Sequence, residues 1–100
     1  MNGWESVSVL IIALNEADRI APALDSIPAG AQRIVADGGS RDNTVAVARD
    51  RGALVVPQDE EAIRAARGNF DVARDAAARR YARRPWILYL DADERISPKL

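Results

Sequence analysis

An almost uninterrupted apolar stretch near the start of the chain constrains the fold most. Residues 7–14 read Val-Ser-Val-Leu-Ile-Ile-Ala-Leu, with β-branched side chains prominent and Ser8 the only polar residue. A strand with one face in water alternates polar and apolar residues, whereas a strand of a parallel sheet covered by helices on both faces does not. The stretch therefore predicts a strand buried on both faces.

The remaining sequence alternates helix-like and strand-like stretches. Apolar residues at helical spacing predict helices over residues 18–27 and 42–51, with Asp18 and Asp42 as their N-caps. The alanine-rich residues 58–84 predict a third helix, interrupted near Gly68. Short apolar stretches predict further strands over residues 33–36, 53–56 and 86–90. This alternation with short loops predicts an α/β fold, a mostly parallel sheet with flanking helices.

The composition limits the chemistry that is available. The chain has 100 residues, enough for one domain, and its 48% hydrophobic and 29% charged residues indicate a folded globular protein. A net charge of −1 provides no basic field for nucleic acid. The absence of Cys and His excludes thiol chemistry, the usual zinc sites and histidine acid–base catalysis. With no basic signal-peptide segment before residue 7, we expect a cytoplasmic location.

The apolar stretch at residues 86–90 is the second informative feature, because acids follow it directly. We expect a buried strand whose exit presents Asp91 and Asp93 on one side, since residues i and i+2 of an extended chain face the same way. Two such carboxylates suit Mg²⁺ or Mn²⁺, with phosphate oxygens completing the shell. The alternative is that these acids cap a following helix that starts near Ser97.

Polar residues follow the other predicted strands as well. Asn15 and Glu16 follow the first strand, and Asp37 follows the second, next to two glycines that allow a ligand to approach the backbone closely. In open parallel sheets, ligands bind beyond the carboxyl ends of the strands. We therefore expect these side chains to converge with Asp91 and Asp93 at one edge of the sheet, although they also suit the capping of helices.

Three blocks of the sequence, taken together, resemble a known family. They cover residues 7–16, residues 34–44 and residues 87–97, the last of which contains Asp-Ala-Asp-Glu-Arg-Ile-Ser. In this order they resemble the N-terminal, nucleotide-sugar-binding part of family 2 glycosyltransferases, which have the Rossmann-like GT-A fold. The last block is similar to the subgroup that includes lipopolysaccharide core glucosyltransferases.

The resemblance implies a nucleotide-sugar donor, with a UDP-sugar preferred, a divalent metal (Mn²⁺ or Mg²⁺), and inverting transfer to an acceptor hydroxyl. It implies a saccharide or lipid-linked acceptor and a role in cell-envelope polysaccharide or lipopolysaccharide synthesis. It implies that Asp93 holds the metal on the diphosphate. The residues that it implies for donor binding are Ala13, Asn15, Glu16, Asp37, Arg74 and Asp91.

Two positions depart from the family pattern, and one part of the family's machinery lies beyond the sequence. Gly38 stands where many relatives have a second acid, and Asp75 stands where Asn commonly follows the arginine. The family's acceptor-binding half and general base come after the acidic motif, so we expect residues 1–100 to form a single, partial donor-binding domain. No catalytic residue is assigned. The alternative function is a nucleotide-binding module that transfers no sugar, and a receiver-like phospho-acceptor domain fits less well.

The arginines near the end of the predicted third helix have two interpretations. Arg79, Arg80, Arg83 and Arg84 either form a solvated helix end, complementing the helix dipole, or contact anionic lipids at the inner face of a membrane.

Overall fold

The computed structural model describes residues 3–58 and 70–96, without the side chains of residues 70–74. Within these ranges the predicted strands and helices are present, with ends shifted by a few residues. The predicted interruption near Gly68 lies outside the described residues. In chain order the elements are a 3-10 turn η1 (Trp4–Ser6), β1 (Val7–Ala13), α1 (Ala17–Asp25), β2 (Gln32–Asp37), α2 (Thr44–Asp50), β3 (Leu54–Pro57), α4 (Phe70–Tyr81) and β4 (Trp86–Asp91).

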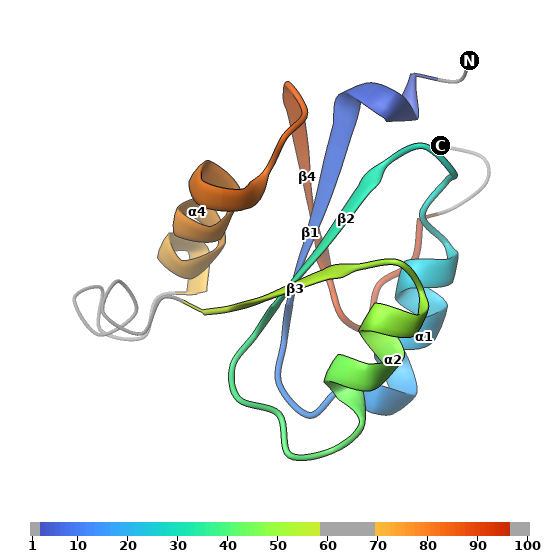
Figure 1. The fold of residues 1–100 in the computed structure, drawn as a ribbon, viewed down its shortest axis with the longest axis vertical. Coiled ribbons are helices and arrows are strands. Elements are labelled where there is room, and N and C mark those ends of the chain that lie inside the picture. Colours follow the sequence, from blue (N-terminus) through green and yellow to red (C-terminus); the bar gives the residue numbers. More distant parts are fainter. Residues whose placement is uncertain (1–2, 59–69, 97–100) are drawn as a thin grey trace.

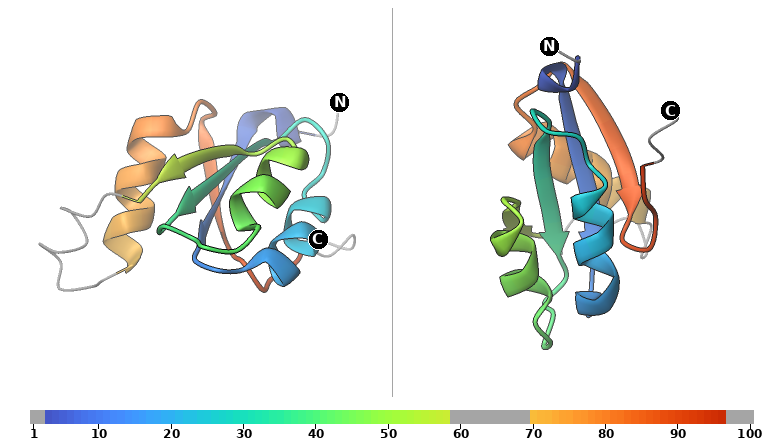
Figure 2. Two further views of the ribbon diagram at one scale, coloured as in Figure 1. Left: turned by 60° about the horizontal axis from the view of Figure 1, so that its bottom comes forward. Right: turned by 90° about the vertical axis from the view of Figure 1, so that its right-hand side faces the viewer.

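The four strands form one sheet in the order β3-β2-β1-β4, and every neighbouring pair is parallel. Helices α1 and α2 lie on one face of the sheet, whereas α4 lies on the other (Figures 1 and 2). This is an α/β fold with a parallel sheet and flanking helices, as the sequence predicts.

β1 occupies the centre of the sheet, and its side chains contribute to two separate cores. Val9 and Ile11 pack with Leu24 of α1 on one face. Leu10 packs with Ala77 of α4 on the opposite face. Because successive side chains of a strand point to opposite faces, a nearly continuous apolar sequence fills both cores. The predicted burial of this strand on two faces is confirmed.

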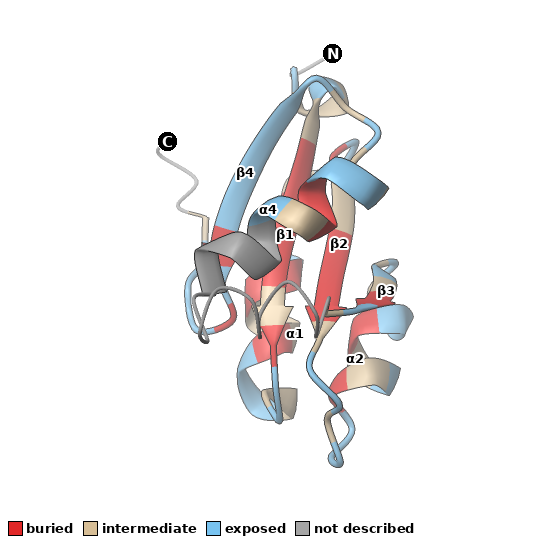
Figure 3. Cartoon of the chain, turned by 90° about the vertical axis from the view of Figure 1, so that its left-hand side faces the viewer, coloured by how far each residue is buried: buried red, intermediate tan, exposed pale blue. Residues whose placement is uncertain are grey.

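The expectation of a buried fourth strand is wrong for most of its length. Trp86 is 71% exposed, and the three residues after it are exposed as well, whereas Leu90 is buried. Figure 3 shows β4 mostly in the colour of exposed residues, beside the buried β1. Within the described residues β4 lies at the edge of the sheet, and α4 contacts β1 and β2 in preference to β4. Apolar sequence alone does not reveal which strand lies at an edge.

The capping of α1 also differs from expectation. The helix begins at Ala17, so Asp18 lies inside its first turn and is not the N-cap. Asp42 Oδ2 accepts a hydrogen bond from the Ala17 N–H at 3.2 Å, and Thr44 Oγ1 accepts one from the Glu16 N–H at 2.8 Å. The start of α1 is therefore capped by Asp42, in the loop before α2, and by Thr44, the first residue of α2.

Asp42 connects the starts of both helices. Its Oδ1 accepts hydrogen bonds from the Thr44 N–H at 2.9 Å and from the Thr44 hydroxyl, so it also caps α2, from one residue before the N-cap Asn43. The Thr44 hydroxyl, the Thr44 N–H and the Ala17 N–H together hold the pKa of Asp42 below its ordinary value, against the opposing effect of desolvation.

Replacing Leu24 with Ala is expected to destabilise the fold by about 2–5 kcal/mol, because Leu24 is fully buried and its loss leaves a cavity. The matched control is Leu14→Ala, which truncates a leucine that is 53% exposed and should change the free energy of unfolding by about 0.5 kcal/mol or less. Urea unfolding followed by circular dichroism measures both changes. Equal losses in the two variants would contradict the assignment of the core.

Asp42→Ala is expected to destabilise the protein in a pH-dependent way. Because the pKa of Asp42 is lowered in the folded state, its ionised carboxylate stabilises the fold fully above the unfolded pKa of about 3.9. This contribution disappears as the pH falls through the lower, folded pKa. The difference in melting temperature between wild type and Asp42→Ala should therefore shrink below about pH 4. Asp50→Ala, at an exposed acid of α2, serves as the control.

Candidate functional site

The carboxyl ends of the four strands meet at one edge of the sheet, as expected from the sequence. In the strand register Asp91 of β4 lies beside Ile12 of β1, and Asp37 of β2 lies beside Ala13. Asp37 in turn lies beside Pro57 at the end of β3. The residues that follow these strands are therefore neighbours in space, although they are far apart in the sequence.

A hollow of about 330 Å³ opens at this edge, and we call it the strand-end pocket. It includes four of the predicted site residues: Ala13, Glu16, Asp91 and Asp93. Two others, Asn15 and Asp37, do not line it, and the side chain of Arg74 lies outside the described residues. The described residues that line it are Ile12, Ala13, Leu14, Glu16, Arg19, Gly38, Gln58, Asp91, Ala92 and Asp93.

The acidic motif bends where the sequence predicts an extended chain. The Glu94 N–H donates to the Asp91 carbonyl at 2.9 Å, closing a tight turn over Ala92 and Asp93. The argument that Asp91 and Asp93 face the same way along a strand is therefore wrong, yet the turn still leaves both on the strand-end pocket. Glu94 supports the strand end, since its Oε1 accepts a hydrogen bond from the Asp91 N–H at 2.8 Å. The alternative of a helix starting near Ser97 falls outside the described residues.

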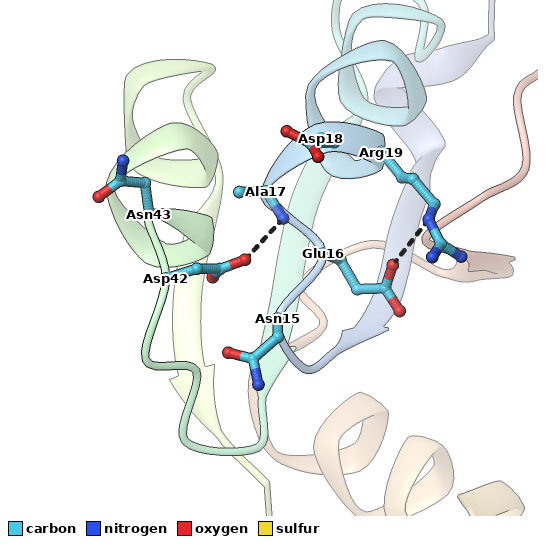
Figure 4. Close-up of a pocket in the computed structure, with 7 residues that line it drawn as sticks. All are labelled: Asn15, Glu16, Ala17, Asp18, Arg19, Asp42 and Asn43. Atoms are coloured by element: carbon cyan, nitrogen blue, oxygen red, sulfur yellow. Dashed lines mark hydrogen bonds and ion pairs between the residues drawn. The ribbon is translucent and has the colours of Figure 1, made fainter.

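Arg19 is a lining residue that the sequence interpretation missed. Its Nε lies 3.5 Å from Glu16 Oε2, so an ion pair joins the start of α1 to its first turn (Figure 4). The spacing of three residues between an acid and an arginine at the start of a helix is the signal that could have revealed this pair. Among its described residues, the pocket therefore has one cation beside three carboxylates.

Asn15 and Asp37 brace the loops beside the pocket. Asn15 has a φ of +52°, a left-handed conformation that asparagine tolerates better than most residues. Its N–H donates to Ser40 Oγ at 2.9 Å, and its Oδ1 accepts a hydrogen bond from the Arg41 N–H at 2.8 Å. These two bonds join the β1–α1 loop to the β2–α2 loop.

The carboxylate of Asp37 is engaged inside its own turn. Its Oδ2 accepts hydrogen bonds from the N–H groups of Gly39 at 3.0 Å and Ser40 at 2.9 Å, and its Oδ1 accepts one from the Ser40 hydroxyl. A donor contact would have to use the remaining lone pairs. The contacts of Asn15 and Asp37 with a nucleotide sugar stay predictions.

A second hollow lies between the starts of α1 and α2 (Figure 4). It is lined by residues 15–19 together with Asp42 and Asn43. Helix starts commonly bind anions through their N–H groups, but here the N–H groups of Glu16 and Ala17 already bond to Thr44 and Asp42. These N–H groups are therefore occupied by capping hydrogen bonds and do not face an anion. The strand-end pocket is the better ligand site.

The donor set of the strand-end pocket fits a metal that arrives with a ligand. Within residues 3–58 and 70–96 there is no group of three or more acids close enough to hold an ion by themselves. Asp91 and Asp93 could supply hard oxygen ligands, and a magnesium- or manganese-type shell would take the remainder from phosphate oxygens and water. A diphosphate bound across the strand ends would provide them.

The arginine-rich end of α4 lies just before the start of β4, away from the carboxyl ends of the strands. Most of these arginines interact with other residues of the chain. Arg79 pairs with Asp75 at 3.1 Å, and the Arg80 guanidinium lies 5.7 Å from the centre of the Tyr81 ring. The Arg84 guanidinium donates to the Glu5 carbonyl. No helix in the described part of the chain is long and apolar enough to cross a membrane. Contact of these arginines with lipid stays a prediction.

The sequence is similar to several proteins described as uncharacterized glycosyltransferases. One from Rickettsia felis is 37% identical over 97 residues, which cover 96% of this chain and 31% of the relative. One from Mycobacterium tuberculosis is 40% identical over 52 residues, which cover 52% of this chain and 24% of the relative. The chain spans about a third of the length of the rickettsial relatives.

The fold is similar to solved structures of the GT-A type. Glucosyl-3-phosphoglycerate synthase from Mycobacterium tuberculosis, in complex with Mn²⁺, UDP and glucosyl-3-phosphoglycerate, matches with a TM-score of 0.64 at 28% identity, over 90% of this chain and 35% of that chain. S. aureus TarS matches with a TM-score of 0.72 at 21% identity, over 94% of this chain and 29% of that chain, a likeness of fold.

The sequence comparison extends to nearly the whole chain. The model of the family described as glycosyl transferase family 2 matches residues 8–100, which include all three sequence blocks and all four strands apart from Val7. By this match and by its GT-A fold, the chain belongs to glycosyl transferase family 2.

Proposed function

We propose that this chain is the donor-binding part of an inverting glycosyltransferase that uses a UDP-sugar and Mn²⁺ or Mg²⁺. The observation that carries the proposal is the placement of Asp91 and Asp93 on a pocket at the carboxyl ends of four parallel strands. The similar mycobacterial synthase, 28% identical, was solved with Mn²⁺ and UDP, which supports the same ligands here.

In this proposal, different residues of the pocket bind the metal and the donor. Asp93 holds the metal, and Asp91 contacts the ribose and donor sugar. The backbone at Ala13 and the carboxylate of Glu16 lie at the end of β1, where they contact the donor. When bound, the metal acts as a Lewis acid that neutralises the charge developing on the diphosphate leaving group. Asp37 and Arg74 complete the proposed donor contacts.

Acceptor activation is assigned to no residue of the described chain. A sugar hydroxyl is a weak nucleophile and needs a general base. Glu94 is close to the pocket, but its Oε1 is bonded to the Asp91 N–H and supports the strand end. The base and the acceptor cleft are therefore proposed to come from the part of the relatives that this chain does not span.

The acceptor class and the cellular role are proposed from the similarity of the last sequence block alone. The block Asp-Ala-Asp-Glu-Arg-Ile-Ser suggests a saccharide or lipid-linked acceptor in cell-envelope polysaccharide or lipopolysaccharide synthesis. Such a reaction would take place in the cytoplasm, at the inner face of the membrane.

The donor proposal is tested by titrating the chain with UDP, with and without Mn²⁺, in a calorimeter. Because two carboxylates supply only part of a metal shell, metal and diphosphate should bind together. We expect UDP binding that strengthens at least tenfold with Mn²⁺, roughly 1.4 kcal/mol. UDP binding that is absent, or that is unchanged by Mn²⁺, would contradict the proposal.

Asp93→Ala is expected to weaken Mn²⁺ binding because it removes a direct metal ligand. Line broadening of amide NMR signals by Mn²⁺, in the presence of UDP, should be centred on residues 91–94 and should decrease in the variant. Asp50→Ala, an exposed acid of α2 away from the pocket, is the matched control and should leave the broadening unchanged. Equal broadening in Asp93→Ala and wild type would show that Asp93 is not the metal ligand.

A further inference from the structure

Gln58 is a lining residue of the strand-end pocket that belongs to none of the three sequence blocks. It follows β3 directly, and its N–H donates to the Asp37 carbonyl at 3.2 Å, which continues the sheet hydrogen bonding past the strand end. Its side chain is half-buried and crosses the ends of β2 and β1. The amide is thus positioned by a strand end and by two neighbouring strands.

The backbone around this amide fixes which way it points. Nε2 donates to the Ala13 carbonyl at 3.4 Å and to the Ala36 carbonyl at 3.3 Å. Both neighbours are acceptors, so only the NH₂ group of the amide can face them. Oε1 must then point away from the two carbonyls, and it accepts no hydrogen bond from the described residues of the chain. Among the described residues, the pocket therefore contains an oriented acceptor that accepts no hydrogen bond.

Gly38 makes room for this arrangement. A Cβ built on Gly38 would lie 3.0 Å from Gln58 Nε2 and 3.3 Å from Gln58 Cδ, closer than ordinary contact. The φ of Gly38 does not lie in the left-handed region, so the backbone itself would accept an alanine. The amide of Gln58 therefore occupies the space into which any side chain at position 38 would extend.

The amide and the acidic residues lie at different parts of the pocket. Asp91 and Asp93 follow β4, whereas Nε2 of Gln58 rests on the ends of β1 and β2. Neighbouring strands are about 4.8 Å apart, so the two groups are separated by roughly one to two strand spacings. A nucleotide that spans both parts of the pocket, with its diphosphate at the acids, would have its base at Gln58. Asp37, at the same end, already uses both carboxylate oxygens inside its own turn.

We infer that Gln58 reads the nucleobase, with Oε1 accepting a hydrogen bond from the ring N3–H of uracil. This inference rests on the proposed function, because it takes the pocket to bind a nucleoside diphosphate. Uracil carries a hydrogen on N3, whereas N3 of cytosine is an acceptor and would face Oε1 with a second lone pair. Gln58 therefore selects UDP over CDP, and Gly38 favours this role because it leaves the amide uncrowded.

The test compares UDP and CDP by titration calorimetry with Mn²⁺ present, on the full chain. The wild type should bind UDP more tightly than CDP. Gln58→Ala should lower the UDP affinity by roughly three- to tenfold, the usual effect of one lost hydrogen bond, and leave CDP unchanged or improved. Gly38→Ala should lower the UDP affinity in the same direction but by less, because its Cβ crowds the amide without deleting it.

Two further variants keep the result interpretable. Asn43→Ala truncates an amide that makes no capping hydrogen bond and lies outside the strand-end pocket, so the preference for UDP should remain. Gln58→Met keeps the length of the side chain without its polar atoms. It should lose the UDP preference as Gln58→Ala does, and it remains informative if thermal unfolding shows that the truncation in Gln58→Ala impairs folding.

The outcomes separate this inference from the proposed function. Manganese-dependent binding of both nucleotides with equal affinity, or a preference for UDP that survives in both Gln58→Met and Gly38→Ala, would overturn the role of Gln58 and leave the donor site standing. Absence of any manganese-dependent nucleotide binding by the folded wild type would overturn both. Loss of the UDP preference in the Gln58 variants, with a smaller reduction in Gly38→Ala and none in Asn43→Ala, establishes the assignment.

Discussion

The burial of β1 on both faces is the constraint on which the rest of the structure depends. Its side chains fill one core under α1 and α2 and another under α4, so helices must cover both faces of the sheet. Strands joined through such helices run parallel, and their carboxyl ends therefore lie at one edge. The position of the pocket follows from this geometry before any catalytic residue is considered.

At that edge the chain uses its polar groups in two ways. Some are occupied by the backbone: Asp37 accepts hydrogen bonds from Gly39 and Ser40, and charge-assisted bonds of this kind are among the stronger ones in proteins. Asp91 and Asp93 are exposed and line the pocket, where carboxylate oxygens suit a metal. A site built in this way places exposed carboxylates beside hydrogen-bonded loops. Such a site favours a bound molecule that brings its own metal cation.

Much of this arrangement was predictable from the sequence, because apolar stretches and turn residues report local structure. The strands, the helices and the convergence of the strand ends were predicted in this way. The caps of α1 were not, since they come from Asp42 and Thr44, whose position beside Ala17 exists only in the folded chain. The exposure of Trp86 depends on which strand lies at the edge. Gln58 belongs to no motif, and its place in the pocket arises from neighbouring strands.

The capping of α1 by distant residues also has a consequence for how the chain folds. The helix has nine residues, and helices of this length are marginal in isolation because nucleation is costly. Its two caps come from side chains 25 and 28 positions further along. These partners arrive only when β2 has joined β1 and closed the intervening loop. The first helix therefore becomes stable together with the pairing of β1 and β2. Because this step needs contacts between residues far apart in the sequence, we expect slower folding than for a helix with local caps.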